Sequence, residues 1–335
     1  MRVMVTGATG FVGFHTAMAL HAAGHELCLL VRSFDKMANV FEPVGLADVD
    51  CVRGDITDEQ SVAKALSGCD AVVHAAAMVS IHAADAERVL HNNLRGTELV
   101  LGGAVEQGIE RMVQVSSTTA LFRRGLGFIG DDSPLGEAPS GYGRSKIECD
   151  RYVRALQDKG APIYTSYPGS ILGPDDPGLS EGVAGLKGML DGRVVFDTTS
   201  GFQFIDARDL GRAHLLLLER GGPPRRFVMG GSFFRWAELA DLLEEVTGER
   251  FLRVPSPAPL MKWLGSLGDL VTRFVKLELP VSLESTTYMT EWARSDDRGV
   301  HEALGLEWRD PRETLRDTIR WLQREKLLLR DYPSV

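Results

Sequence analysis

The stretch Thr6-Gly7-Ala8-Thr9-Gly10-Phe11-Val12-Gly13 follows a short apolar segment and leads into a segment with helical spacing. A strand, a glycine-rich turn and a helix in this order are typical of dinucleotide binding. Glycine lets the backbone approach a pyrophosphate, and the free amides at the helix start favour its negative charge. We therefore expect a phosphate-binding turn made of Gly7, Thr9, Gly10, Phe11, Val12 and Gly13.

Short apolar strands alternate with helical stretches through the first half of the chain. Stretches of helical length such as Phe11–Ala23 and Glu87–Gln107 separate the strands. This alternation of strands and helices predicts an α/β fold with a doubly wound parallel sheet of the Rossmann type and helices on both faces. The strands are expected at Val3–Thr6, Glu26–Val31, Val49–Arg53, Ala71–His74, Met112–Ser116 and Ile163–Tyr167.

The second half has a looser pattern, with glycine and proline punctuation after Pro174. We expect a dinucleotide-binding domain over residues 1–174, to which the chain returns around 200–230, and a smaller C-terminal substrate-binding domain over 175–335. A final helix is expected at Pro311–Leu329. Apolar helical spacing in Pro255–Leu279 favours ordinary core packing, with a lid helix or a partner surface as alternatives.

Composition limits the classes of protein to consider. The chain has 335 residues, 44% of them hydrophobic, and four cysteines without a CxxC pair, which favours a reducing compartment over a disulfide framework or a metal site. No leader-like or membrane-spanning run stands out, so we expect a cytoplasmic protein without stable membrane insertion. A formal charge of -9 disfavours nucleic acid as a partner.

The end of the expected second strand indicates which coenzyme the protein prefers. It ends in Val31-Arg32, without the acidic residue that would bind a ribose 2'-hydroxyl. A guanidinium there can bind a 2'-phosphate, so NADP(H) is preferred and NAD(H) remains possible; alternatively, Arg32 is a solvated surface residue. Asp55 and Ile56, after the third strand, are expected at the adenine. Ala75, Ala76 and Ala77, after the fourth, leave room for ribose and phosphates, while His74 is expected to pack structurally.

The sequence Tyr142-Gly143-Arg144-Ser145-Lys146 begins an expected helix, so Tyr142 and Lys146 share one face. A nearby ammonium stabilises a phenolate, which makes Tyr142 a candidate acid and base. Ser117 closes the fifth strand at the edge where the cofactor is expected. We expect Ser117 and Tyr142 to bind a substrate oxygen and Lys146 to bind the nicotinamide ribose. Met78 and Thr118 complete the expected substrate contacts, although Thr118 can also simply pack.

With the glycine motif, Ser117 and the Tyr142–Lys146 pair in this order, nearly the whole chain resembles the extended short-chain dehydrogenase/reductase family. Asn93-Leu94-Arg95-Gly96-Thr97 is similar to the NVxGT helix segment of that family, and Tyr167–Pro174 is similar to its RPxxVYGP segment. Phe204–Leu210 is similar to a third segment, in the substrate half. The resemblance implies cofactor contacts from Asn93, Pro168, Gly169, Ser170 and Ile171. It also implies a homodimer paired through helices like Glu87–Gln107 and Tyr142–Lys159.

Departures from the family patterns favour the branch of dihydroflavonol 4-reductase-like enzymes. Ser117-Thr118-Thr119 lacks the Thr-Asp-Glu string of nucleotide-sugar dehydratases, and Ser170 replaces the asparagine of many nucleotide-sugar enzymes. Apolar residues expected at the pocket suit an apolar carbonyl compound: Met78, Val79, Leu121, Phe122, Phe128 and Leu172. Alternatively, these residues fill the core.

The sequence thus predicts an NADP(H)-dependent oxidoreductase that interconverts a hydroxyl and a carbonyl on a small, apolar substrate. A nucleotide-sugar epimerase with bound NAD would use the same trio of Ser117, Tyr142 and Lys146, and Arg32 speaks against it. A noncatalytic NADP(H)-sensing protein is the third hypothesis, because the fold alone does not establish chemistry.

Overall fold

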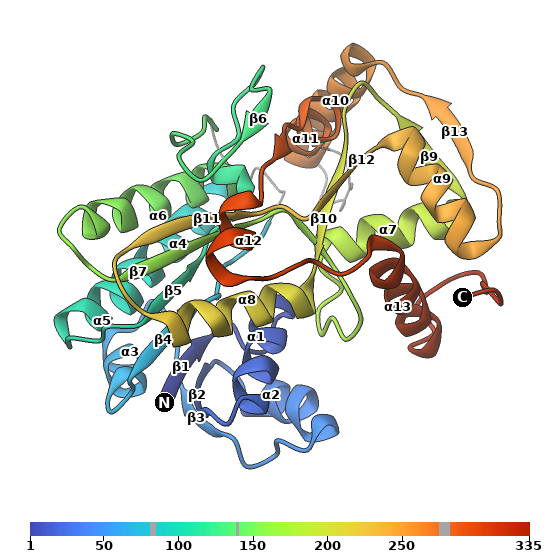
Figure 1. Ribbon diagram of the computed structural model, residues 1–335. Helices are drawn as coiled ribbons and strands as arrows, with labels where there is room; N and C mark the ends of the chain where they lie inside the picture. The colour runs from blue at the N-terminus through green and yellow to red at the C-terminus, as the bar shows by residue number, and fades with distance from the viewer. Residues whose placement is uncertain (81–84, 139–140, 275–281) are drawn as a thin grey trace.

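The computed structural model of the chain describes residues 1–80, 85–138, 141–274 and 282–335. Its centre is a seven-stranded parallel sheet in the order β11-β7-β5-β4-β1-β2-β3 (Figure 1). The order reverses between β1 and β4, which confirms the doubly wound α/β fold. The strands are β1 Arg2–Thr6, β2 Glu26–Val31, β3 Asp50–Arg53, β4 Ala71–His74, β5 Met112–Val115, β7 Ile163–Pro168 and β11 Arg225–Met229.

Alternating side chains of the central strands supply two cores. In β1, Val3 and Val5 belong to the cluster on one face of the sheet, whereas Met4 belongs to the cluster on the other, and all three are fully buried. This alternation follows from the two-residue period of a strand, and burial on both faces requires the continuous apolar run that β1 carries.

Helices cover both faces of the sheet (Figure 1). One face carries α1 Phe11–Ala22, α2 Phe34–Phe41, α8 Ala207–Arg220 and α12 Arg298–Leu304. The other carries α3 Glu59–Leu66, α4 Ala86–Thr97, α5 Gly103–Glu106 and α6 Gly141–Gln157. The helical stretch expected at Glu87–Gln107 is confirmed: α4 continues through a π-helical segment, Glu98–Gly102, directly into α5.

The second half of the chain builds a separate core from smaller sheets. β12, β10 and β8 form one sheet, and β13 pairs with β9 in another. The elements are β8 Ser170–Leu172, α7 Glu181–Gly192, β9 Val194–Asp197, β10 Gly201–Asp206, β12 Ser232–Arg235, α9 Trp236–Thr247, β13 Leu252–Pro255, α10 Ala258–Phe274, α11 Leu283–Glu291 and α13 Pro311–Arg324. The division of the chain at residue 174 stays a prediction.

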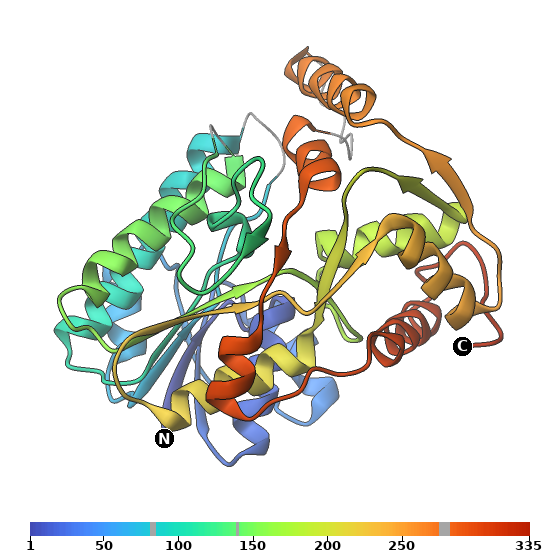
Figure 2. The same ribbon diagram turned by 45° about the horizontal axis from the view of Figure 1, so that its top comes forward.

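Two short strands bring a late segment of the chain beside an early loop. β6 Phe128–Ile129 pairs with β14 Arg294–Ser295, which follows α11. The loop that follows the fifth strand of the sheet therefore lies next to α11, and both lie near the carboxyl ends of the central strands (Figure 2).

The helix expected at Pro311–Leu329 ends earlier than predicted. α13 stops at Arg324, and Lys326 adopts a positive φ of 57°, which a helix cannot contain. Among the described residues no helix is long and apolar enough to cross a bilayer.

The expectation of ordinary core packing for Pro255–Leu279 was wrong for the residues that the structure describes. α10 lies at an edge of the molecule, away from the seven-stranded sheet (Figure 2). Its apolar side chains Leu260, Trp263 and Leu267 are 50%, 61% and 42% exposed. Residues 275–279 of the expected segment lie outside the described residues.

Candidate active site

The turn after β1 meets the end of β4 at the point where the strand order reverses. Gly7 has a φ of +72°, and a Cβ there would lie 2.7 to 2.8 Å from the backbone of Ala75 and Ala76. The Gly10 amide donates to the Gly7 carbonyl at 2.9 Å and closes the turn. Only glycine fits this position, because an L-residue would meet both a strained φ and fixed backbone.

The first amides of α1 are available for an anion. Gly10 precedes the helix without a side-chain cap, and no acidic residue stands in the first turn. The N–H groups of the residues that follow it, Phe11, Val12 and Gly13, have no partner within the helix. The Phe11 ring is 6% exposed and packs in the C-terminal core, so its contribution here is its backbone. Thr9 is half-buried in the same turn. This cradle fits a dinucleotide diphosphate.

His74 ends β4 as a packing residue. Its Nδ1 lies 2.8 Å from Thr6 Oγ1, and its Nε2 lies 3.3 Å from Thr97 Oγ1. Burial, together with the charge of Lys146, lowers the pKa of His74 to about 3, so the ring is neutral. The Ala76 amide donates to Thr6 Oγ1 at 3.2 Å, which fixes the small residues Ala75–Ala77 against β1.

The two groups expected around the adenosine lie at the ends of β2 and β3. Arg32 is exposed and forms no ion pair with any described residue. Asp55 Oδ1 accepts hydrogen bonds from the Thr57 amide at 2.9 Å and the Thr57 hydroxyl at 2.8 Å, so Asp55 also shapes its own turn. Ile56 packs where a side chain on Gly96 would otherwise lie.

Tyr142 and Lys146 lie on the first turns of α6, with the ammonium 5.6 Å from the centre of the Tyr142 ring. Lys146 is 7% exposed, and its Nζ donates to the Val115 carbonyl, at the end of β5, at 3.1 Å. Among the described residues Lys146 has no carboxylate partner. The structure thus brings together a buried ammonium and a half-buried phenol, as the sequence predicts.

The segment after β5 presents Ser117 and buries Thr118. Ser117 is half-buried, and its Oγ accepts from the Thr119 amide at 3.2 Å, at the start of a short 3₁₀ helix, Thr118–Ala120. The Thr118 hydroxyl donates to the Pro168 carbonyl at 3.0 Å and is 1% exposed, so it links two strand ends. The structure therefore places Ser117 at the carboxyl edge, two residues after the Val115 carbonyl that accepts from Lys146, and keeps the Thr118 hydroxyl in packing.

Asn93 is hydrogen-bonded to the loop that carries Met78. Its Oδ1 accepts from the Met78 amide at 2.7 Å, and its Nδ2 donates to the Met78 carbonyl at 3.0 Å and to Ser145 Oγ at 3.0 Å. Ser145 is a neighbour of Lys146 in α6. The amide of Asn93 thus holds the loop after β4 and the helix of the reacting pair together, which is a positioning contact.

The residues from Pro168 to Ile171 follow the carboxyl end of β7. Gly169 donates its amide to the Met229 carbonyl at 3.2 Å, and Ser170 and Ile171 enter β8, where they pair with β10. Both side chains are half-buried. They lie at the same edge of the sheet as Ser117, because β5 and β7 are neighbouring parallel strands.

The apolar residues expected to line a substrate pocket divide into two groups. Leu121 and Leu172 are fully buried core residues, and Phe122 is 4% exposed, so these three follow the alternative in which they fill the core. Val79 and Phe128 remain 50% and 49% exposed. Apolar residues after a strand commonly fill the core, and this explains the difference.

Three residues near the site come from α11 and its end, which the sequence motifs did not indicate. Glu284 accepts from the Gly143 amide at 3.0 Å and from the Tyr288 hydroxyl at 2.9 Å. Trp292 stacks on Phe122 with ring centres 5.4 Å apart. No local signal could have joined Gly143 to Glu284, because 141 residues separate them.

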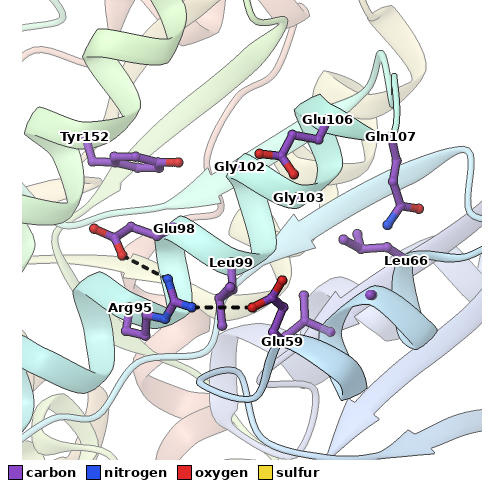
Figure 3. A pocket seen from close by; sticks show the side chains of 12 residues that line it. Glu59, Leu66, Arg95, Glu98, Leu99, Gly102, Gly103, Glu106, Gln107 and Tyr152 are labelled. Atoms are coloured by element: carbon purple, nitrogen blue, oxygen red, sulfur yellow. Dashed lines mark ion pairs between the residues drawn. The ribbon is translucent and has the colours of Figure 1, made fainter.

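A cavity of about 410 Å³ lies elsewhere, between α3, the π-helical segment and α6 (Figure 3). Arg95 lies between Glu59 and Glu98, at 3.9 and 3.5 Å. None of the expected site residues lines it. This cavity is therefore separate from the expected site at the sheet edge. Among the described residues no cluster of His, Cys, Asp or Glu could hold a metal ion.

Three features define the class of protein as a nucleotide-dependent enzyme of the extended short-chain dehydrogenase/reductase superfamily. They are the point where the strand order reverses, the uncapped glycine turn beside it, and the helix that carries Tyr142 and Lys146. The model of the NAD dependent epimerase/dehydratase family matches residues 3–230, and the chain belongs to this family. Its members bind NAD or NADP.

Several known proteins are similar along nearly the full chain. The sterol demethylase protein B of Methylococcus capsulatus is 28% identical, over 98% of this chain and 100% of its own. A putative dihydroflavonol 4-reductase of Synechocystis is 26% identical, over 95% of this chain and 94% of its own. The crystal structure of gox2253 has a TM-score of 0.79 at 25% identity and covers 97% of this chain and 99% of its own.

Proposed function

We propose that the protein is an NADP(H)-dependent oxidoreductase that interconverts a hydroxyl and a carbonyl on an apolar small molecule. The observation that carries the proposal is the buried Lys146 ammonium beside Tyr142, held by the Val115 carbonyl at the end of β5, two residues before Ser117. An ammonium, a phenol and a hydroxyl at the edge of a dinucleotide-binding sheet are the groups that this chemistry needs.

Each of the three residues has one role. In the reducing direction the Ser117 hydroxyl donates to the substrate oxygen, and the Tyr142 phenol transfers its proton to that oxygen as the carbonyl becomes an alcohol. The phenolate that remains is stabilised by the Lys146 ammonium until it regains a proton from solvent. The nicotinamide ring, when bound, supplies or accepts the hydride. In the oxidising direction the same groups act in reverse.

Arg32 supports NADP(H) as the preferred cofactor. It is exposed at the end of β2 and has no ion-pair partner among the described residues, so its guanidinium is available for a 2'-phosphate. A charge-assisted hydrogen bond to that phosphate would contribute about 1.5 to 3 kcal/mol, or roughly a 10- to 150-fold preference. We expect a lower Kd for NADPH than for NADH by that factor.

An apolar substrate is supported by two observations. The exposed side chains of Val79 and Phe128 belong to the loops that follow β4 and β5 at the reacting edge. The two similar proteins are named for a sterol and for a dihydroflavonol, which are small polycyclic compounds rather than sugar nucleotides. We infer a polycyclic or similarly apolar alcohol or ketone as the class of substrate.

A nucleotide-sugar epimerase is the second candidate, because the matching family includes epimerases and epimerisation would use the same trio. It requires transient oxidation and return of the hydride with no net change in the cofactor. A homodimer through α4 and α6 and a cytoplasmic location stay predictions.

The decisive experiment compares Tyr142→Phe with the wild type in a screen of apolar ketones, apolar alcohols and sugar nucleotides with NADPH and NADH. We expect turnover to fall by roughly 10²- to 10⁴-fold, because the general acid is lost. Tyr152→Phe is the matched control, since Tyr152 lies on the same helix but lines the separate cavity. Near-normal turnover of Tyr142→Phe would refute the mechanism. Isomerised sugar nucleotide without a change in nicotinamide absorbance would favour the epimerase, and NADP binding without any turnover would favour a sensing protein.

A further inference from the structure

The first turn of α6 is held from outside by a carboxylate of α11. Helix α6 begins at Gly141, and the first amides of a helix have no partner within it. The Gly143 amide donates to Glu284 Oε1 at 3.0 Å. Glu284 thus binds the backbone one residue after Tyr142, at the positive end of the helix dipole.

The residues on either side of Tyr142 leave room for this contact. A side chain on Gly141 would collide with Glu284 Oε2, and Gly141 also has a positive φ of 74°. A Cβ on Gly143 would lie 2.7 Å from the Tyr288 hydroxyl and 3.0 Å from Glu284 Oε1. Both glycines therefore permit the close approach of the Glu284–Tyr288 pair, and Tyr142 is the residue between them.

Helix α11 also contacts the segment that follows Ser117. The Tyr288 hydroxyl donates to Glu284 Oε1 at 2.9 Å, and its ring meets the edge of the Phe122 ring at 5.2 Å. Phe122 follows the 3₁₀ helix that Ser117 begins. One helix of the substrate half thus touches both segments that carry the reacting side chains.

The protonation of the pair suits this role. Burial is the main cause that raises the pKa of Tyr288 well above its usual value, and the charge of Glu284 adds to it, so the phenol remains a hydrogen-bond donor. Burial also raises the pKa of Glu284, while the bonds from Tyr288 and Gly143 act in the opposite direction. In either protonation state Oε1 can accept from both donors.

We propose that Glu284 is a positioning residue, which fixes the first turn of α6 so that the Tyr142 phenol faces the substrate oxygen. This inference rests on the proposed function of Tyr142. Because Glu284 belongs to the substrate half, the position of the proton donor depends on how α11 sits on α6. α11 is also hydrogen-bonded to α10, because the Leu283 amide donates to Asp269 Oδ2 at 3.1 Å.

The test compares Glu284→Ala with Glu284→Gln. The glutamine retains an oxygen that can accept from Gly143 and Tyr288, whereas alanine removes it. We expect Glu284→Ala to lower kcat by roughly 10- to 100-fold, with KM and the Kd for NADPH changed by less than about threefold, because a displaced proton donor slows chemistry more than binding. Glu284→Gln should recover kcat to within about threefold of the wild type. Glu291→Ala is the matched control, because Glu291 lies on the same helix but pairs with Lys262 and Arg124 rather than with α6.

Hydrogen exchange of the amides of residues 141–146 gives a readout that needs no substrate. Exchange should be faster in folded Glu284→Ala than in the wild type, and close to the wild type in Glu284→Gln and Glu291→Ala. Unchanged exchange in the alanine variant would overturn the proposal, as would unchanged kcat. If Tyr142→Phe retains turnover while the exchange pattern holds, the proposed function fails and the helix contact stands.

Discussion

The glycine turn of residues 7–13 and the apolar face of α10 are both regular sequence patterns, yet the turn is tightly packed and the face of α10 is exposed. The turn lies against the backbone at the end of β4, with a Cβ at Gly7 excluded by Ala75 and Ala76. The face of α10 carries Leu260 and Trp263 at helical spacing, and half or more of each side chain is exposed.

The difference shows which kind of pattern determines structure. A glycine in a strand-turn-helix context is fixed by backbone geometry, which leaves no alternative residue. Apolar helical spacing only defines a face, and what covers that face depends on the surrounding fold. The cofactor half should therefore be intolerant of substitutions that the outer helix accepts.

The largest effect is expected for Gly7→Ala. An alanine with φ near +72° is strained, and its Cβ would also overlap fixed backbone, so we expect a loss of roughly 4 kcal/mol in the free energy of unfolding. Affinity for NADPH should fall by at least about 100-fold, since the turn must open to admit the side chain. Urea unfolding and NADPH fluorescence titration measure the two quantities.

Gly24→Ala is the control that separates strain from overlap. Gly24 has a similar φ of +82°, but nothing lies within 4 Å of a Cβ there. It should cost about 1 to 2 kcal/mol and leave NADPH binding unchanged. Equal costs for the two substitutions would mean that close approach to β4 does not define the turn.

A smaller effect is expected from acid, through two histidines buried in the cofactor half. His74 supports the glycine turn through Thr6, and His214 lies 2.9 Å from both Thr16 Oγ1 and Ser166 Oγ. Burial lowers the pKa of each to about 3 from a value of 6.5. Below pH 6.5 the unfolded chain binds protons that the folded chain does not, so stability falls as the pH falls toward 3. Each histidine should cost about 2 kcal/mol between about pH 7 and pH 5.

The variant His214→Gln isolates one of these contributions. It loses part of the hydrogen bonding at neutral pH, but its unfolding free energy should fall about 2 kcal/mol less than that of the wild type between the same two pH values. Urea unfolding at both values gives the comparison. Parallel pH dependences would show that His214 is protonated in the folded protein.

Much of the fold could be predicted because the signals were local. Every strand expected in the first half exists in the central sheet, with ends shifted by about one residue, since buried parallel strands are continuous apolar runs. The π-helical segment Glu98–Gly102 could not be predicted, because no residue type marks it. The Tyr152 hydroxyl occupies the space where a side chain on Gly102 would lie, which is a tertiary contact.

The site was predictable only where one segment carries the chemistry. The glycine turn and the Tyr142–Lys146 pair follow from spacing within a single turn or helix. Whether Thr118 faces the site or the Pro168 carbonyl depends on how two strand ends meet. Glu284 is further removed, because its role arises only when α11 packs on α6. Contacts between distant segments require the fold itself.

The smallest effect is expected on the exposed face of α10. Leu260→Ala should change the free energy of unfolding by no more than about 0.5 kcal/mol, because Leu260 is 50% exposed and leaves no closed cavity. The same substitution at Leu66, which is 1% exposed on α3 in the core that packs against the sheet, should cost about 2 to 5 kcal/mol. Urea unfolding of the two variants at low protein concentration makes the comparison. A loss of unfolding free energy at Leu260 that approaches the loss at Leu66 would mean that this face of α10 is covered in solution. The glycine turn and α10 would then differ in what packs against them, and not in how well they tolerate substitutions.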